Sequence, residues 1–183
     1  MSKYAKMTDE QYFAAMDEFI EKYQAPQPEP VKVLNLLMRK PFAEAIVKGE
    51  KTVEVRAFSD HYFNRLTDKK VDKWMTDFRA KHGDDEEAME AFTEFMCATR
   101  PVERIHFHNY NNSWHLDVSV TENALIGLTD EAVADLQNRL GCHEFDEMAE
   151  SFRAKNDPHR PLFYYFVVGG VIDTDLKPGV ADK

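Results

Sequence analysis

Residues 31–57 constrain the fold more than any other stretch of the chain. "VKVLNLLM" is typical of a buried strand. "KPFAEAIVKG" predicts a short helix, with Pro41 at a plausible first helical position and Gly49 as its stop. "KTVEVRAF" then predicts a second strand. The stretch is thus a compact, well-punctuated strand–helix–strand unit.

The remaining segments indicate an α+β fold. Residues 58–99 show helical spacing of apolar side chains, as in Val71, Trp74 and Phe78. "ERIHFHNY" and "SWHLDVSV" alternate around an "NNS" turn, "ENALIGL" is a further apolar run, and "TDEAVADLQNRLG" and "EFDEMAESFRA" predict short helices. "PLFYYFVVGGVID" predicts a final strand with a bulge or bend at Gly169-Gly170. We expect a small, curved, mostly antiparallel sheet or barrel with helices packed around it.

The N-terminal region is a separate part of the predicted organisation. Residues 8–23 form an amphipathic helix pattern, whose Thr8 and Gln11 have capping-box spacing. "APQPEP" ends that helix as a proline-rich linker. We therefore divide the chain into a helix and linker (1–30), a domain (31–176) with a helical insertion at about 58–99, and a tail (177–183). The apolar stripe of the first helix should pack on the barrel or on a second copy.

Composition limits the classes of function. The formal net charge is -10, which argues against a broad electrostatic grip on duplex nucleic acid but allows a small basic pocket. No stretch reaches the length of a membrane span, and the N-terminus lacks the apolar core of an export signal. We expect a cytoplasmic protein with reduced Cys97 and Cys142, no membrane association and no cofactor. The oligomeric state stays open, with a dimer possible.

The charged strand within "VKGEKTVEVR" is the best candidate site. Strand alternation turns Val53 and Val55 toward the core, so Thr52, Glu54 and Arg56 share the other face. Glu54 and Arg56 are then about 7 Å apart along the strand, and Lys51 can swing over the same place. Two interpretations follow: an exposed surface ion pair, or a preformed polar site.

The stretch "LNLLMRKPFAEAIVKGEKTVEVR" resembles the start of an ASCH domain, a family of PUA-like β-barrels. The family pattern G-x-K-x-x-E-x-R is present as Gly49, Lys51, Glu54 and Arg56. Residues 32–57 match well, and 125–173 match loosely through the aromatic strand "LFYYFVVGG". The resemblance implies a cavity that binds RNA or a modified nucleotide, with ligand-binding candidates Lys51, Thr52, Glu54, Arg56 and Arg39.

The same resemblance leaves an enzyme as the alternative, either a ribonuclease or an acylcytidine amidohydrolase, with Lys51 and Glu54 as catalytic candidates. The amidohydrolases pair a Lys with a Thr three residues later and a distant Glu. Here Glu54 stands where the Thr belongs, Leu140 lies near the position of the distant Glu, and Glu144 is out of register. A protein-interaction module that uses the acidic insertion is a third possibility.

A histidine cluster and an aromatic set are secondary candidates. His106 and His108 share a strand face, and His115 lies across the predicted turn. Three such histidines can bind zinc, or a pair of them can cleave RNA by acid–base chemistry, but with only Asp117 nearby we expect a polar hairpin face and no metal. An aromatic set that could stack on a base comprises Tyr110, Trp114, Tyr164 and Tyr165.

Overall fold

The computed structural model describes residues 3–127, 129–141 and 162–177, in two compact units. One unit comprises Met1–Glu29 and Asn64–Arg100, and the other comprises Pro30–Phe63 and Pro101–Lys183. The predicted helix "EFDEMAESFRA" and all but the first residue of the predicted tail lie outside the described residues. In the described part of the chain, no helix is long and apolar enough to cross a membrane.

The first unit is helical. It contains the 3-10 helix η1 (Lys3–Lys6) and the helices α1 (Asp9–Tyr23), α4 (Lys69–His82) and α5 (Glu86–Phe95), while α3 (Asp60–Leu66) spans the junction with the second unit. Thr8 and Gln11 form the predicted capping box at the start of α1. The apolar stripe of α1 packs through Phe19 against Phe78 of α4 and Phe95 of α5. The partner of the stripe is therefore these two helices of the predicted insertion, where the sequence led us to expect the barrel or a second copy.

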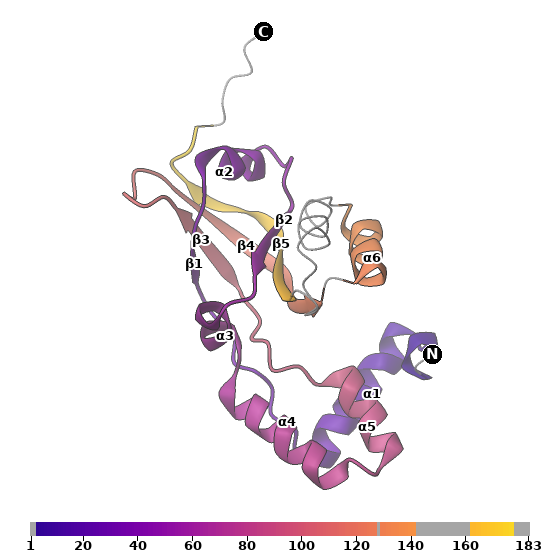
Figure 1. Cartoon of the computed structure of the whole chain (residues 1–183). Helices are drawn as coiled ribbons and strands as arrows, with labels where there is room; N and C mark the ends of the chain where they lie inside the picture. Colours follow the sequence, from indigo (N-terminus) through magenta and orange to yellow (C-terminus); the bar gives the residue numbers. More distant parts are fainter. Residues whose placement is uncertain (1–2, 128, 142–161, 178–183) are drawn as a thin grey trace. The chain divides into compact units, whose positions relative to one another are not determined.

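The second unit is built on a curled, half-barrel sheet of five strands within the described residues (Figure 1). The strand order is β1-β3-β4-β5-β2, and among the described strand pairs β1–β3 is parallel and the other three are antiparallel. The strands are β1 (Leu34–Leu37), β2 (Val53–Ala57), β3 (Arg104–His108), β4 (His115–Gly127) and β5 (Leu162–Thr174), and the helices are α2 (Lys40–Val47) and α6 (Asp130–Leu140). The prediction of an α+β fold with a mostly antiparallel sheet is confirmed.

Alternation along the strands separates two faces of the sheet. Leu34 and Leu36 of β1 are buried, as are their partners Ile105 and Phe107 of β3. The intervening residues carry the histidines to the opposite face. At the other edge of the sheet, Val53 packs with residues of α6 and β5. In the long strands β4 and β5 the alternation gives way to runs of buried residues, since Phe163–Phe166 of β5 are all buried.

A bulge lies where the sequence predicts one. The register between β4 and β5 shifts near Val118, Val120 and Glu122, and Gly169 has no direct partner in the ladder. A Cβ on Gly169 would lie 2.7 Å from the Thr121 methyl carbon and 2.8 Å from the Ser119 hydroxyl oxygen. Such irregularities bend a strand and increase its twist, which is how this sheet curls.

Candidate functional site

The turn after α2 sets the position of the charged strand. Gly49 has a φ of 74°, in the left-handed region that favours glycine. The backbone N–H groups of Glu50 and Lys51 both donate to the carbonyl of Ala45, at 2.9 and 3.2 Å, so the chain folds back on its helix. Val53 then enters the apolar cluster beneath α6. Strand alternation consequently turns Glu54 to the opposite face.

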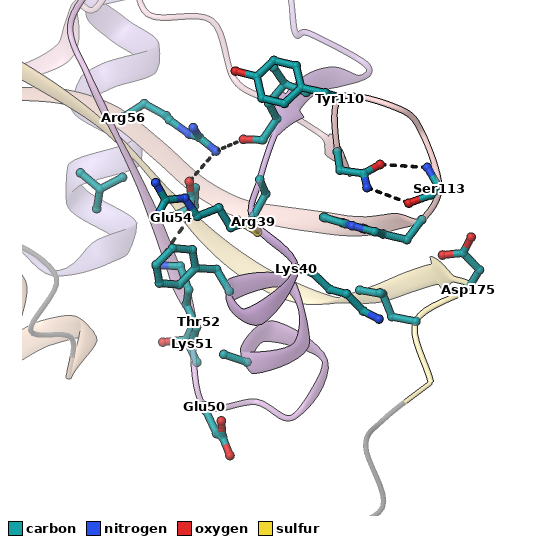
Figure 2. Close-up of a pocket in the computed structure, with 18 of the residues that line it drawn as sticks. Arg39, Lys40, Glu50, Lys51, Thr52, Glu54, Arg56, Tyr110, Ser113 and Asp175 are labelled. Atoms are coloured by element: carbon teal, nitrogen blue, oxygen red, sulfur yellow. Dashed lines mark hydrogen bonds and ion pairs between the residues drawn. The ribbon is translucent and has the colours of Figure 1, made fainter.

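Glu54 lies between two cations at the floor of a cleft (Figure 2). Its Oε1 is 2.8 Å from Arg56 Nη2, and its Oε2 is 3.6 Å from Lys51 Nζ. The side chains of Glu54, Lys51 and Arg56 are only 8%, 14% and 22% exposed. The interpretation as an exposed surface pair is therefore wrong, because the carboxylate is almost fully withdrawn from water.

The guanidinium of Arg56 is held in place by the protein, and one of its N–H donors is left unsatisfied. Its Nη2 also donates to the Leu37 carbonyl at 2.8 Å. Its Nε is buried and has no hydrogen-bond partner among the described residues. A buried donor left unsatisfied costs about 1–3 kcal/mol, so the position of the Arg56 side chain is held at some cost in stability.

The cleft above this cluster has a volume of about 1590 Å³. That is larger than the roughly 300–1000 Å³ of a typical small-molecule pocket. Its walls are the β1–α2 junction, the strand β2, the β3–β4 hairpin and the end of β5. The hairpin is braced where Asn109 Nδ2 donates to Ser113 Oγ at 2.7 Å and Ser113 N donates to Asn109 Oδ1 at 2.9 Å (Figure 2).

The charge of the cleft is opposite in sign to that of the chain. Of the described residues that line it, five carry cationic side chains and three carry acidic ones. The net charge of the whole chain is -10. A low-dielectric cleft concentrates the field of its own charges, so it can attract an anion on an acidic protein. The cationic residues are Arg39, Lys40, Lys51, Arg56 and Lys177, and the acidic residues are Glu50, Glu54 and Asp175.

The structure gathers all five ligand-binding candidates at this cleft: Lys51, Thr52, Glu54, Arg56 and Arg39 line it. From the aromatic set, Trp114 lines it as a buried side chain and Tyr110 as a 92% exposed one. Tyr164 is instead fully buried and stacks on Phe58 with ring centroids 6.3 Å apart. Tyr165 belongs to the apolar cluster beneath α6.

The histidines occupy the sheet face opposite the buried side chains of β3. The ring of His106 stacks on His108 and on His115, with centroids 5.6 and 5.9 Å apart. His106 Nδ1 lies 2.8 Å from Asp117 Oδ1. The hydrogen bond to Asp173 raises the pKa of His115 above its ordinary value. This cluster is thus a polar surface distinct from the cleft floor.

Several residues of the cleft are absent from the sequence-based candidates. Lys40, Ser113, Asp175 and Lys177 line it, although no motif marks them. The backbone N–H of His115 donates to Asp175 and holds the pKa of that carboxyl below its ordinary value. The predicted "NNS" turn joins β3, the neighbour of β1, to β4. It is the signal in the sequence that could have indicated that this hairpin forms a wall of the cleft.

The amidohydrolase pattern requires a distant Glu as its third residue, and no acidic residue stands at that position in the described part of the chain. Leu140 packs at the edge of the apolar cluster beneath α6. Glu144 lies outside the described residues.

The chain matches no protein-family model, no curated protein and no solved structure. Its function is therefore inferred from the chemistry of the cleft and from the motif that places Lys51, Glu54 and Arg56 in it.

Proposed function

We propose that the sheet unit is an ASCH-like domain of the PUA-like type, which binds single-stranded RNA or a modified nucleotide in the cleft. The observation that carries the proposal is the buried Lys51–Glu54–Arg56 cluster at the floor of a cleft with excess positive charge. The resemblance of residues 32–57 to the start of an ASCH domain supports it, and so does the curled half-barrel sheet.

The cluster suits recognition of a base edge. Glu54 fixes the plane of Arg56 through Oε1, and a carboxylate has about four lone-pair sites, so it can still accept from an exocyclic amino group. The planar guanidinium of Arg56, whose side chain is 22% exposed, offers further N–H donors for a carbonyl or ring-nitrogen acceptor. A planar fork of donors beside a fixed acceptor is suited to a nucleobase, which presents both kinds of group on one edge.

The surrounding charges suit a phosphate. Lys51 belongs to the cluster, while Arg39 and Lys40 line the cleft from the N-terminal end of α2. The N-terminal end of a helix carries partial positive charge, which adds to that of the side chains. Tyr110, 92% exposed on the hairpin, offers a flat surface on which a neighbouring base can stack. A nucleotide would therefore meet base, phosphate and stacking contacts in one cleft.

Fluorescence anisotropy with a labelled five-nucleotide RNA of mixed sequence tests the proposal. We expect the full chain to bind it, and Lys51→Ala and Arg56→Ala each to weaken binding at least tenfold, as the loss of a charge-assisted contact should. Competition by nucleoside monophosphates then compares bases and modified bases. Melting temperatures of the variants confirm that they are folded.

Lys69→Ala and Lys70→Ala are the matched controls, because both lysines are exposed on α4 and neither is among the residues that line the cleft. They should leave the affinity unchanged. Absence of RNA and nucleotide binding would overturn the proposal. Loss of binding in the α4 variants, with Lys51→Ala and Arg56→Ala unaffected, would instead place the contact on the helical unit.

A further inference from the structure

A second cluster of polar side chains lies on the histidine face of the sheet, where strands β4 and β5 pair. Asp117 of β4 pairs directly with Asp173 of β5, and His115 lies two residues before Asp117 on the same face. One ligand-type atom from each of His115, Asp117 and Asp173 lies within 4.8 Å of the others. Three atoms at that spacing can all contact one ion at about 2.0–2.2 Å after small side-chain rotations.

The neighbours of these three residues orient them. Asp175 Oδ2 lies 3.4 Å from His115 Nδ1, and Asp175 Oδ1 accepts from the His115 backbone N–H at 2.8 Å. With Nδ1 facing that carboxylate, His115 Nε2 faces Asp173 Oδ2 at 3.2 Å. A carboxylate behind the second nitrogen of a histidine is the usual support of a metal-binding imidazole.

Asp117 is supported in the same way. Its Oδ1 is 2.8 Å from His106 Nδ1, which leaves Oδ2 for another contact. Its side chain is 13% exposed, so it is largely withdrawn from water. Hydrogen bonds from outer residues commonly hold metal-binding carboxylates in this manner.

The charges also favour a cation. Asp117 and Asp173 are directly opposite each other on neighbouring antiparallel strands, where like charges destabilise a sheet. The ion pairs of these two carboxylates are with His106 and His115 in the described residues. Asp175 adds a third carboxylate beside the same imidazole. A bound divalent ion would offset this concentration of negative charge.

We propose that His115 Nε2 and the carboxylates of Asp117 and Asp173 bind one divalent transition-metal ion. The set of one imidazole and two carboxylates suits Zn²⁺ or Mn²⁺ better than Mg²⁺ or Ca²⁺, which take oxygen ligands. Three protein ligands leave at least one position for water or an outside oxygen ligand. The proposal replaces the sequence-based expectation of no metal, and it does not depend on nucleotide binding in the cleft.

Isothermal titration of the full chain, freed of any affinity tag, with ZnCl₂ and with MnCl₂ tests the site. We expect one ion of each metal per chain, and much weaker binding of MgCl₂. His115→Ala and Asp173→Asn should each weaken Zn²⁺ and Mn²⁺ binding more than about 100-fold, and His106→Ala about tenfold, since outer residues typically contribute 10- to 100-fold. Asp173 is 70% exposed, so its conservative variant should fold normally.

His61→Ala is the control, because His61 is an exposed histidine of α3 with no part in the cluster. It should bind zinc as the wild type does. Imidazole ¹⁵N NMR gives a second measurement, in which Zn²⁺ should shift the Nε2 signal of His115 and leave that of His61 in place. No one-to-one binding of either ion, equal loss in His61→Ala, tighter binding of Mg²⁺ or an unshifted His115 signal would each overturn the proposal.

Discussion

Glu54 and Arg56 form a buried ion pair on one face of β2, with Oε1 and Nη2 2.8 Å apart and the Glu54 side chain only 8% exposed. Withdrawing a carboxylate from water is costly unless its partners stay in place. Arg56 is itself anchored to the Leu37 carbonyl, so the pair ties β2 to the end of β1. The same contacts that hold the site rigid therefore also stabilise the sheet unit.

Removing the Glu54 carboxylate should consequently make the protein easier to unfold. We expect Glu54→Ala to lower the free energy of unfolding by roughly 3–5 kcal/mol, because it leaves the Arg56 charge buried without its partner. Urea denaturation followed by circular dichroism measures the effect. Asp77→Ala is the matched control, since the Lys73–Asp77 pair is 2.7 Å apart but 76% and 65% exposed. Such a surface pair contributes under about 1 kcal/mol. Equal losses of unfolding free energy in the two variants would show that the Glu54–Arg56 pair stabilises the protein no more than a surface pair does.

Acetylated cytidine should not be a substrate. The amidohydrolases that resemble ASCH domains use a Thr three residues after the Lys, and here the Glu54 carboxylate stands at that position, 3.6 Å from Lys51 Nζ. A carboxylate paired with Lys51 and Arg56 cannot provide the hydroxyl that the pattern requires. Chromatography of acetylcytidine incubated with the protein should show no release of cytidine. Turnover that Lys51→Ala abolishes would assign Glu54 a catalytic role.

The arrangement of β2 could be predicted from the sequence because strand alternation alone decides which side chains share a face. It correctly separates Val53 from Glu54. The burial of Glu54 could not be predicted in this way, because it depends on walls from the β1–α2 junction and the β3–β4 hairpin. Asn109 and Ser113, which brace that hairpin, carry no motif of their own.

The histidine cluster shows the same limit. Its histidines follow from alternation on neighbouring strands, but Asp173 joins it from the last strand and Asp175 from just after that strand. Their contact with His115 depends on a register that passes through the irregularities near Gly169. One bulge more or less would change the register and move both aspartates relative to His115. The number of bulges cannot be predicted from the sequence alone.

The packing of α1 predicts a strong position effect within one helix. Phe19 is 4% exposed and lies against the rings of Tyr23, Phe78 and Phe95, with centroids 4.9, 5.8 and 5.9 Å away. Phe19→Ala should cost about 3–5 kcal/mol of unfolding free energy, because it leaves a cavity among these rings. Phe13→Ala, in the same helix at 57% exposure, should cost under about 1 kcal/mol. Equal urea midpoints for the two variants would contradict this packing.

Stability should depend on pH through Glu122. Two hydrogen bonds from Arg139, 2.6 and 2.7 Å long, and one from the Tyr165 hydroxyl hold the pKa of Glu122 below its ordinary value of 4.5. A carboxyl whose pKa is lowered by folding stabilises the protein above its unfolded pKa, and the contribution is lost as pH falls through the folded pKa.

Glu122→Gln should therefore melt at a lower temperature than the wild type at pH 7, and the difference should shrink steadily below about pH 4.5. Melting curves at a series of pH values measure it. Glu103→Gln, which changes an exposed carboxyl on the same unit, serves as the control and should show no such trend. A Glu122→Gln difference that is constant from pH 7 to pH 3 would show that the Arg139 contact does not act through this titration.

The charge balance of the cleft predicts weak salt dependence of RNA binding. A chain with net charge -10 cannot neutralise a long run of phosphates, so we expect the cleft to contact only one or two of them. For single strands, the slope of log affinity against log salt is about -0.7 per phosphate, which gives a slope of roughly -0.7 to -1.4 for one or two contacts. Arg39→Ala should reduce the steepness by about 0.7 if that side chain neutralises one phosphate, while Lys70→Ala should leave it unchanged. Anisotropy titrations of the five-nucleotide RNA at several salt concentrations measure these slopes. A slope steeper than about -4 would require more phosphate contacts than the cleft can make, and would move the binding surface elsewhere on the chain.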